Sequence, residues 1–103
     1  MSRAAKRVPL APEIAYRRLN RSPQWIVERG RIYRDFRFEN FKAALSFANA
    51  VANIADRVGH HPNMFLHEYH FVRVETYDHL TGGLSTKDLE LIRAIDRLNV
   101  PQS

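Results

Sequence analysis

A chain of 103 residues with 45% hydrophobic and 26% charged residues has the composition of one small folded domain, which excludes a disordered chain and leaves no room for a second domain. The absence of cysteine excludes disulfides and thiolate metal sites, and no apolar run approaches the roughly 20 residues that span a bilayer. The formal net charge of +5 is concentrated in residues 1–31, which hold eight Lys and Arg residues against Glu13 and Glu28.

The basic N-terminal segment is not followed by a long apolar stretch, so we expect no secretory signal and a cytoplasmic protein. The positive charge of the first third would attract a polyanion, but no nucleic-acid-binding signature accompanies it. We therefore expect neither a membrane nor a nucleic acid as the partner.

The N-terminal third predicts a helix followed by a hairpin. Helical spacing of Leu10, Ile14 and Leu19 predicts a helix over residues 9–20, which Ser22-Pro23 ends. Two strands are then predicted over residues 25–28 and 32–38, joined by a turn at Arg29-Gly30.

The longest predicted helix covers residues 41–58. Asn40 precedes it as a good N-cap, and Gly59 follows it as the C-terminal stop, where a left-handed residue is easiest for glycine. Its apolar positions are Phe41, Ala44, Leu45, Phe47, Ala48, Val51, Ile54, Ala55 and Val58. Such a wide stripe indicates burial against a sheet and a contact between subunits.

The C-terminal half predicts two strands and a last helix. The alternation of Val72, Val74 and Thr76 predicts a strand with one buried face, preceded by a shorter strand around residues 64–67. Gly82-Gly83 forms a turn. A capping box, with Ser85 as N-cap and Asp88 at N3, begins a helix that runs to about residue 98.

The order helix, strand, strand, helix, strand, strand, helix predicts an α+β domain. Its centre is a four-stranded antiparallel sheet with the helices packed on one face. We expect this domain at residues 10–98, between a basic flexible tail at 1–9 and a C-terminal tail at 99–103.

Two adjacent histidines after the long helix are the first candidates for function. His60 and His61 precede Pro62, and histidine exchanges protons readily because its pKa lies near neutrality. Adjacent residues in an extended chain point to opposite sides, so a pocket here is approached by both rings, or by one ring while the other is structural. His79 follows the predicted strand at the end of the sheet. Surface histidines without a special role are the alternative.

Metal binding is a second alternative, since His60, His61, His67, His70 and His79 supply five imidazoles. The chain has no helical His-x-x-x-His pair, so we predict no metal site. Asp88 has a sufficient structural explanation in its capping box. Asp56, one turn before His60, either orients an imidazole or is solvated.

The spacing of these residues resembles the signature of the pterin-4a-carbinolamine dehydratase family. The residues that carry the resemblance are Asp56, His60-His61-Pro62, Tyr69, His79 and Asp88. It extends over about residues 10–98, through Pro23-Gln24-Trp25, the segment 36–41 and the segment 82–85.

The resemblance implies a lyase that dehydrates 4a-hydroxytetrahydropterin to quinonoid dihydropterin in tetrahydrobiopterin recycling, with no cofactor. It implies that His60, His61 and His79 carry the proton transfers. Asp56 would support the histidines, and Pro62 and Asp78 would line the pterin site. The assignment of acid and base among the histidines stays open.

The resemblance also implies a homodimer or homotetramer, with a pterin-dependent hydroxylase as a pathway partner. Family members act as protein-binding partners too, so the alternative is a non-enzymatic interaction module of the dimerisation-cofactor or transcriptional-coactivator type. Six residues separate Pro62 from Tyr69, where many animal members have five, which predicts a shift or bulge in the short strand.

Overall fold

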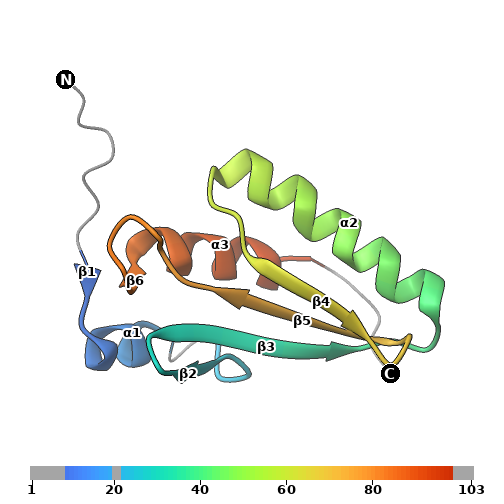
Figure 1. Ribbon diagram of the computed structural model, residues 1–103, viewed down its shortest axis with the longest axis horizontal. Coiled ribbons are helices and arrows are strands. Elements are labelled where there is room, and N and C mark those ends of the chain that lie inside the picture. The colour runs from blue at the N-terminus through green and yellow to red at the C-terminus, as the bar shows by residue number, and fades with distance from the viewer. Residues whose placement is uncertain (1–8, 20–21, 99–103) are drawn as a thin grey trace.

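The computed structural model describes residues 9–19 and 22–98 of the chain. The elements, in chain order, are β1 (Pro9–Leu10), α1 (Pro12–Arg18), β2 (Ile26–Glu28), β3 (Arg31–Arg37), α2 (Phe41–Val58), β4 (Asn63–His67), β5 (Phe71–Thr76), β6 (Leu84–Ser85) and α3 (Thr86–Asp96). Four strands form an antiparallel sheet in the order β2-β3-β5-β4, and β1 pairs with β6 separately (Figure 1). The predicted α+β fold is confirmed.

One face of the four-stranded sheet is buried, as the alternation along β5 predicted. Val72, Val74 and Thr76 of β5 are all buried. Ile32 and Phe36 of β3 pair directly with Thr76 and Val72, so they share this face, and both are buried as well. The sheet therefore contributes a continuous apolar layer to the core.

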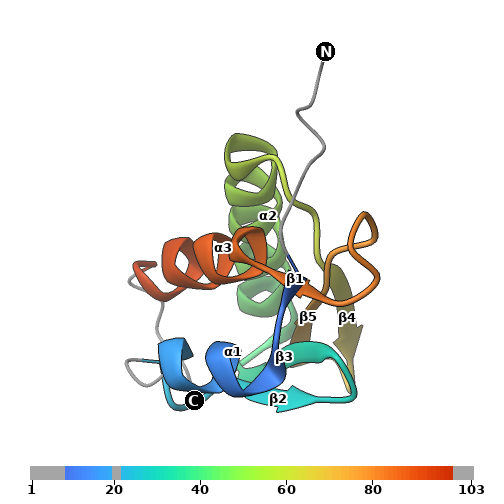
Figure 2. The same cartoon turned by 90° about the vertical axis from the view of Figure 1, so that its left-hand side faces the viewer.

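Helices α2 and α3 cover the buried face, and α1 lies at the β2 end of the sheet (Figure 2). Their core residues include Phe47, Val51 and Ile54 of α2 and Leu89, Ile92 and Ile95 of α3. Burying each of these side chains contributes about 1.5–3 kcal/mol. Within the described residues, no helix is both long and apolar enough to cross a membrane.

The predicted ends of α2 are confirmed. The Asn40 side chain accepts a hydrogen bond from the Ala43 N–H at 2.8 Å. At the other end Gly59 adopts a left-handed conformation, with φ of 78°, and its N–H donates to the Ala55 carbonyl. The chain therefore leaves α2 at a defined angle, which directs the histidines that follow.

The N-terminal helix is shorter than predicted. Pro9 and Leu10 pair with Ser85 and Leu84 instead of beginning a helix. Ala11 is extended because the residue before a proline disfavours helical geometry, and Pro12 then begins α1. The predicted end of the helix at residue 20, residues 1–8 of the predicted tail at 1–9, and the predicted tail at 99–103 lie outside the described residues, whereas Pro9 belongs to β1.

The expected bulge in the short strand is absent. β4 pairs with β5 over five consecutive residue pairs, from Asn63–Glu75 to His67–Phe71, without interruption. The connection between them holds two left-handed residues, Glu68 and Tyr69, with φ of 48° and 56°. The irregular backbone is therefore in the turn and not in the strand.

The solvent-facing side of the sheet carries a two-point ion pair. Arg73 donates from Nε and Nη2 to the two carboxylate oxygens of Asp35, each at 2.8 Å. These hydrogen bonds hold the pKa of Asp35 below its ordinary value, and the same contact raises the pKa of Arg73. The pair stabilises the pairing of β3 with β5.

Candidate active site

The pairing of β4 with β5 brings the two histidine segments together. The segment 60–62 leads into β4 and the segment 77–79 leaves β5, so both lie at the same end of the sheet (Figure 1). His67 and His70 lie at the opposite end of the two strands. Three of the five histidines are therefore gathered by the antiparallel topology.

His60 is the inward-facing histidine of the adjacent pair. Its N–H donates to the Ala55 carbonyl at 3.2 Å as the chain leaves α2, and the residue is only 5% exposed. Its Nε2 lies 2.8 Å from Oδ1 of Asp88, the N3 residue of α3. The ring is thus fixed between the end of one helix and the start of another.

Asp88 accepts hydrogen bonds from several groups at once. Thr76 Oγ1 donates to Oδ1 at 2.6 Å, and the Ser85 N–H donates to Oδ2 at 2.8 Å. The residues Thr76, Ser85 and Asp88 are essentially inaccessible to solvent. The carboxylate that accepts these bonds also contacts Nε2 of His60, so it fixes the orientation of the His60 ring.

His61 faces solvent. Its Nε2 lies 2.9 Å from Oδ1 of Asp56, and the two side chains are 66% and 77% exposed. The two adjacent rings therefore lie in different environments, His60 buried and His61 exposed, although both residues line the cleft described below. Asp56 therefore contacts one of the two histidines while remaining largely exposed to solvent.

His79 lies on a tight loop that Asp78 organises. The Asp78 N–H donates to the Gly83 carbonyl at 2.6 Å, and the Leu80 N–H donates to Asp78 Oδ1 at 2.9 Å. Ser85 Oγ donates to Asp78 Oδ2 at 2.6 Å. His79 itself is exposed, with its ring 4.4 Å from that of Tyr77.

These segments enclose a cleft of about 290 Å³ at the end of the sheet. Its walls are Gly59, His60, His61, Asp78, His79 and Leu80. The three predicted catalytic histidines and Asp78 therefore lie together. Asp56 is not part of the wall and contacts it through His61. Pro62 is not part of the wall either, and it leads into β4.

The polar network behind His60 is the part of the site that sequence reasoning missed. Asp88 was interpreted as a helix cap, and it is one, but the same carboxylate also holds His60. Two signals were available, because the capping box directs Asp88 back over the start of α3 and the alternation along β5 turns Thr76 inward. Among the described residues, no group of three or more His, Asp or Glu side chains is arranged to hold a metal ion.

A four-stranded antiparallel sheet with histidines from two segments at one end defines a small α+β domain with a histidine-lined cleft. The comparisons with known proteins then identify the family. The family model described as "Pterin 4 alpha carbinolamine dehydratase" matches residues 8–98. The chain therefore belongs to the pterin-4-alpha-carbinolamine dehydratase family.

Individual relatives give the same result. A protein of Synechococcus sp. (strain WH7803) is 42% identical over 79 residues, which cover 77% of this chain and 84% of the relative. A protein of Chloroflexus aurantiacus is 42% identical over 80 residues, covering 78% and 85%. Both carry the name pterin-4-alpha-carbinolamine dehydratase provisionally.

Two solved structures have the same fold. A transcriptional coactivator/pterin dehydratase from Brucella melitensis superposes with a TM-score of 0.77 at 26% identity, covering 86% of this chain and 96% of that one. A pterin dehydratase-like protein, identified as a RuBisCO assembly factor in the alpha-carboxysome, superposes with a TM-score of 0.54 at 19% identity, covering 70% and 82%. The second likeness concerns the fold alone.

Proposed function

We propose that this chain is a dehydratase that converts a 4a-hydroxytetrahydropterin to quinonoid dihydropterin and water. The observation that carries the proposal is the convergence of His60, His61 and His79 on one cleft, with His60 held by the buried Asp88. Membership of the family supports the same reaction.

The reaction needs one proton donor and one proton acceptor. The C4a–O bond breaks as a general acid protonates the leaving hydroxyl, which departs as water. A general base takes the proton from N5, and the C4a=N5 double bond forms. Imidazoles serve both steps near neutral pH, and a positioned acid or base contributes about 10²–10⁴-fold to the rate.

The three histidines divide by environment into one fixed ring and two exposed rings. His60 lines the cleft and is held by Asp88, so the orientation of its ring is fixed. His61 and His79 are exposed, so either exchanges protons with solvent between turnovers. The cleft volume of about 290 Å³ suits a planar bicyclic ring, since it lies near the lower end of the ~300–1,000 Å³ typical of ligand pockets.

Pro62 and Asp78 act indirectly in this proposal. Pro62 restricts the backbone of His61 to extended geometry. Asp78 accepts hydrogen bonds from Leu80 and Ser85, which fixes the loop on which His79 lies. Both residues thereby shape the pterin site, in a cytoplasmic protein that would serve a pterin-dependent hydroxylase.

Stopped-flow absorbance with a freshly generated 4a-hydroxytetrahydropterin tests the proposal. We expect the wild-type protein to accelerate formation of the quinonoid product. The double variant His61→Ala/His79→Ala should return the rate to nearly the uncatalysed value. The matched control is His67→Ala/His70→Ala, at the other end of β4 and β5. A wild-type rate equal to the uncatalysed rate contradicts the proposal.

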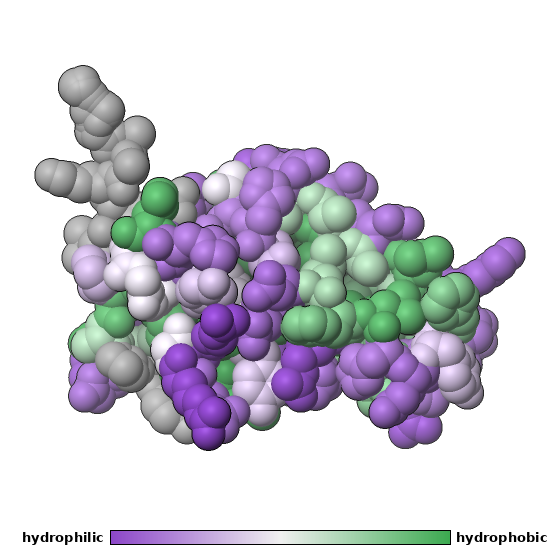
Figure 3. All heavy atoms as spheres, viewed as in Figure 1, coloured by the Kyte–Doolittle hydropathy of each residue, from purple (hydrophilic) through white to green (hydrophobic). Residues whose placement is uncertain are grey.

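We also propose that α2 and β4 form the contact between copies in a homodimer or homotetramer. Phe41, Leu45 and Phe65 are 50%, 44% and 52% exposed. Figure 3 shows hydrophobic side chains gathered over α2 and the adjoining edge of the sheet. β4 is an edge strand, so one side of its backbone is unpaired within the sheet.

The same apolar surface favours a second candidate function, a non-enzymatic interaction module. Such a module would bind a different protein through α2 and would not need the histidines. The two candidates are separated by the histidine variants, because a pure interaction module retains its full function in His61→Ala/His79→Ala.

A further inference from the structure

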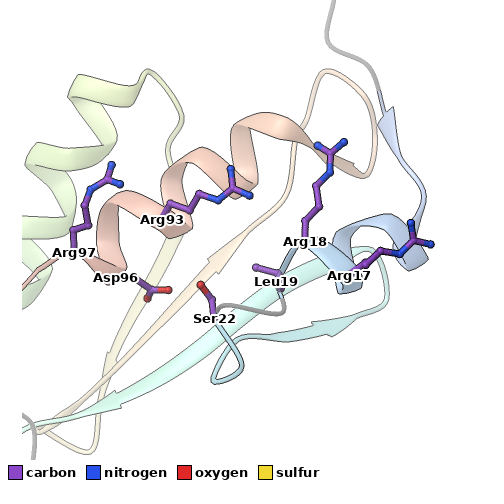
Figure 4. A pocket seen from close by; sticks show the side chains of 7 residues that line it. All are labelled: Arg17, Arg18, Leu19, Ser22, Arg93, Asp96 and Arg97. Carbon is purple, nitrogen blue, oxygen red and sulfur yellow. The ribbon is translucent and has the colours of Figure 1, made fainter.

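We propose that the chain has a second ligand site, a pocket between the ends of α1 and α3 that binds a phosphorylated small molecule. The pocket measures about 530 Å³. Four arginines line it, two from each helix end, together with Ser22 and Asp96 (Figure 4).

This pocket is separate from the histidine cleft. The two share no lining residue. α3 lines only the arginine pocket, but Asp88 in its first turn contacts His60 behind the cleft, whereas Arg93 and Arg97 lie towards its other end. Arg93 and Arg97 follow Asp88 by five and nine positions, which corresponds to roughly 7–14 Å along the axis. A ligand in one site therefore does not contact the other.

The guanidinium groups of the pocket have no ion-pair partner among the described residues. The four arginines concerned are Arg17, Arg18, Arg93 and Arg97. Asp96, the acidic side chain in the wall, already contacts two residues outside the pocket lining. The indole N–H of Trp25 donates to its Oδ1 at 2.9 Å, and Arg34 Nη1 lies 3.4 Å from the same oxygen. The charge of Asp96 is therefore shared with Arg34.

The negative ends of the helix dipoles balance only part of the positive charge of the four arginines. Basic residues in the last turn of a helix offset its negative end, and Arg17, Arg18 and Arg93 are so placed. Two helix ends carry only about half a negative charge each. With Asp96 included, the wall still has a surplus of about two positive charges, which an anion would balance.

The floor of the pocket offers a hydrogen-bonding group as well. Ser22 is 8% exposed, and its hydroxyl has no hydrogen bond within the described part of the chain. In Figure 4 this hydroxyl points towards α3, from which Asp96 and Arg93 extend, and Arg18 extends from the end of α1 towards the same helix. A buried hydroxyl in a pocket that is also lined by guanidiniums is suited to an oxyanion.

A phosphoryl group fits this combination, because the planar guanidinium fork matches the oxygens of phosphate with two parallel bonds. The volume of about 530 Å³ exceeds what a bare phosphate needs and lies within the range of ~300–1,000 Å³ for small-molecule pockets. Buried Leu19 adds an apolar surface to the wall. The occupant we infer is therefore a phosphate ester with an organic body.

Titration of the full chain with inorganic pyrophosphate and with ribose 5-phosphate, at constant ionic strength, tests the proposal. Trp25 is the single tryptophan and bonds to Asp96, so its fluorescence reports on this pocket, and calorimetry gives the stoichiometry. We expect saturable binding of one ligand per chain. Arg18→Gln/Arg93→Gln should weaken it about tenfold or more, because charge-assisted hydrogen bonds are lost.

The matched control is Arg37→Gln/Lys42→Gln, which removes the same charge from exposed positions outside the pocket. It should change the affinity less than about twofold. An equal loss in both double variants, or no saturation up to roughly 10 mM ligand, overturns the proposal.

The same titrations test the chemical class of the ligand. Equal affinity for citrate and pyrophosphate overturns the assignment of a phosphoryl group. Binding of ribose 5-phosphate no tighter than inorganic phosphate overturns the organic body. Duplex DNA serves as a competitor in the same assay. If it displaces pyrophosphate from the wild-type protein and its own binding is lost when Arg18 and Arg93 are replaced, the pocket is assigned to nucleic acid instead.

Discussion

Nε2 of His60 lies 2.8 Å from Oδ1 of Asp88, although the two residues are 28 positions apart. The contact joins the end of α2 to the first turn of α3. Asp88 is therefore both a helix cap and the group that orients a histidine of the cleft. In the proposed reaction it is a positioning residue, since it acts on the substrate through His60.

Replacing Asp88 by Asn should lower kcat about 10²-fold or more while changing KM little, because the orientation of His60 is lost and the cleft wall is retained. The pH–rate profile should change shape with it. Stopped-flow kinetics over a pH series measures both effects.

Asn40→Ala is the control for this variant. It removes the side chain that caps the start of α2, at the other end of that helix from the cleft, and costs about 1 kcal/mol of stability without touching Asp88 or a cleft residue. Its kcat should stay within a few-fold of wild type. Equal losses of kcat in the two variants would show that Asp88 acts only through folding.

His61→Ala and His79→Ala should each lower turnover by about 10²–10⁴-fold, because each removes a proton-transfer group from the cleft. Both side chains are exposed, so the free energy of unfolding should change by less than about 0.5 kcal/mol. Single-turnover kinetics and urea denaturation measure the two quantities. Wild-type turnover in both single variants would remove these histidines from the mechanism.

Gly59→Ala should destabilise the domain by about 1–2 kcal/mol, because Gly59 has a φ of 78° that alanine adopts only with strain. A Cβ there meets no atom within 4 Å, so the cost is in the backbone. Gly83→Ala is the matched control, since Gly83 has an equally open environment and no left-handed φ. Urea denaturation compares them, and equal losses would contradict this explanation.

Asp35→Asn should reduce the acid sensitivity of the fold. The pKa of Asp35 is lowered mainly by the hydrogen bonds from Arg73, so the pair stabilises the fold above the unfolded-state value of about 3.9. That stabilisation is lost as the pH falls through the lower pKa of the folded state. The side chains are more than a third exposed, so the cost at pH 7 should be at most about 1 kcal/mol. Urea denaturation at pH 7 and pH 3 should show the variant losing less stability than wild type, and a parallel loss in both proteins would contradict the assignment.

Leu45→Glu/Phe65→Glu should dissociate the homo-oligomer, because charges would be buried at the contact between copies. Light scattering after size-exclusion chromatography measures the mass. Ser46→Glu places a charge on another side of α2 and should leave the mass unchanged. A wild-type protein that is monomeric at all accessible concentrations would contradict the predicted contact.

Local signals were strong enough to predict most elements. The bounds of α2 follow from Asn40, Gly59 and the apolar stripe between them, and the buried face of β5 follows from strict alternation. These features depend on neighbours within a few residues. The start of α1 was wrong because Pro9 and Leu10 pair with β6, which lies some 75 residues further along the chain.

The sequence by itself determined the family, the order of the three helices and of the four strands in the main sheet, and the identity of the three cleft histidines, since these depend on residue type and spacing. Only the tertiary structure decided that His60 faces inward to Asp88 while His61 faces solvent. It also decided that arginines of α1 and α3 enclose a second pocket. The physical reason is that each relationship brings together residues that are far apart in the chain. How close they come depends on how the helices pack on the sheet, which is set by the whole core and not by neighbouring residues.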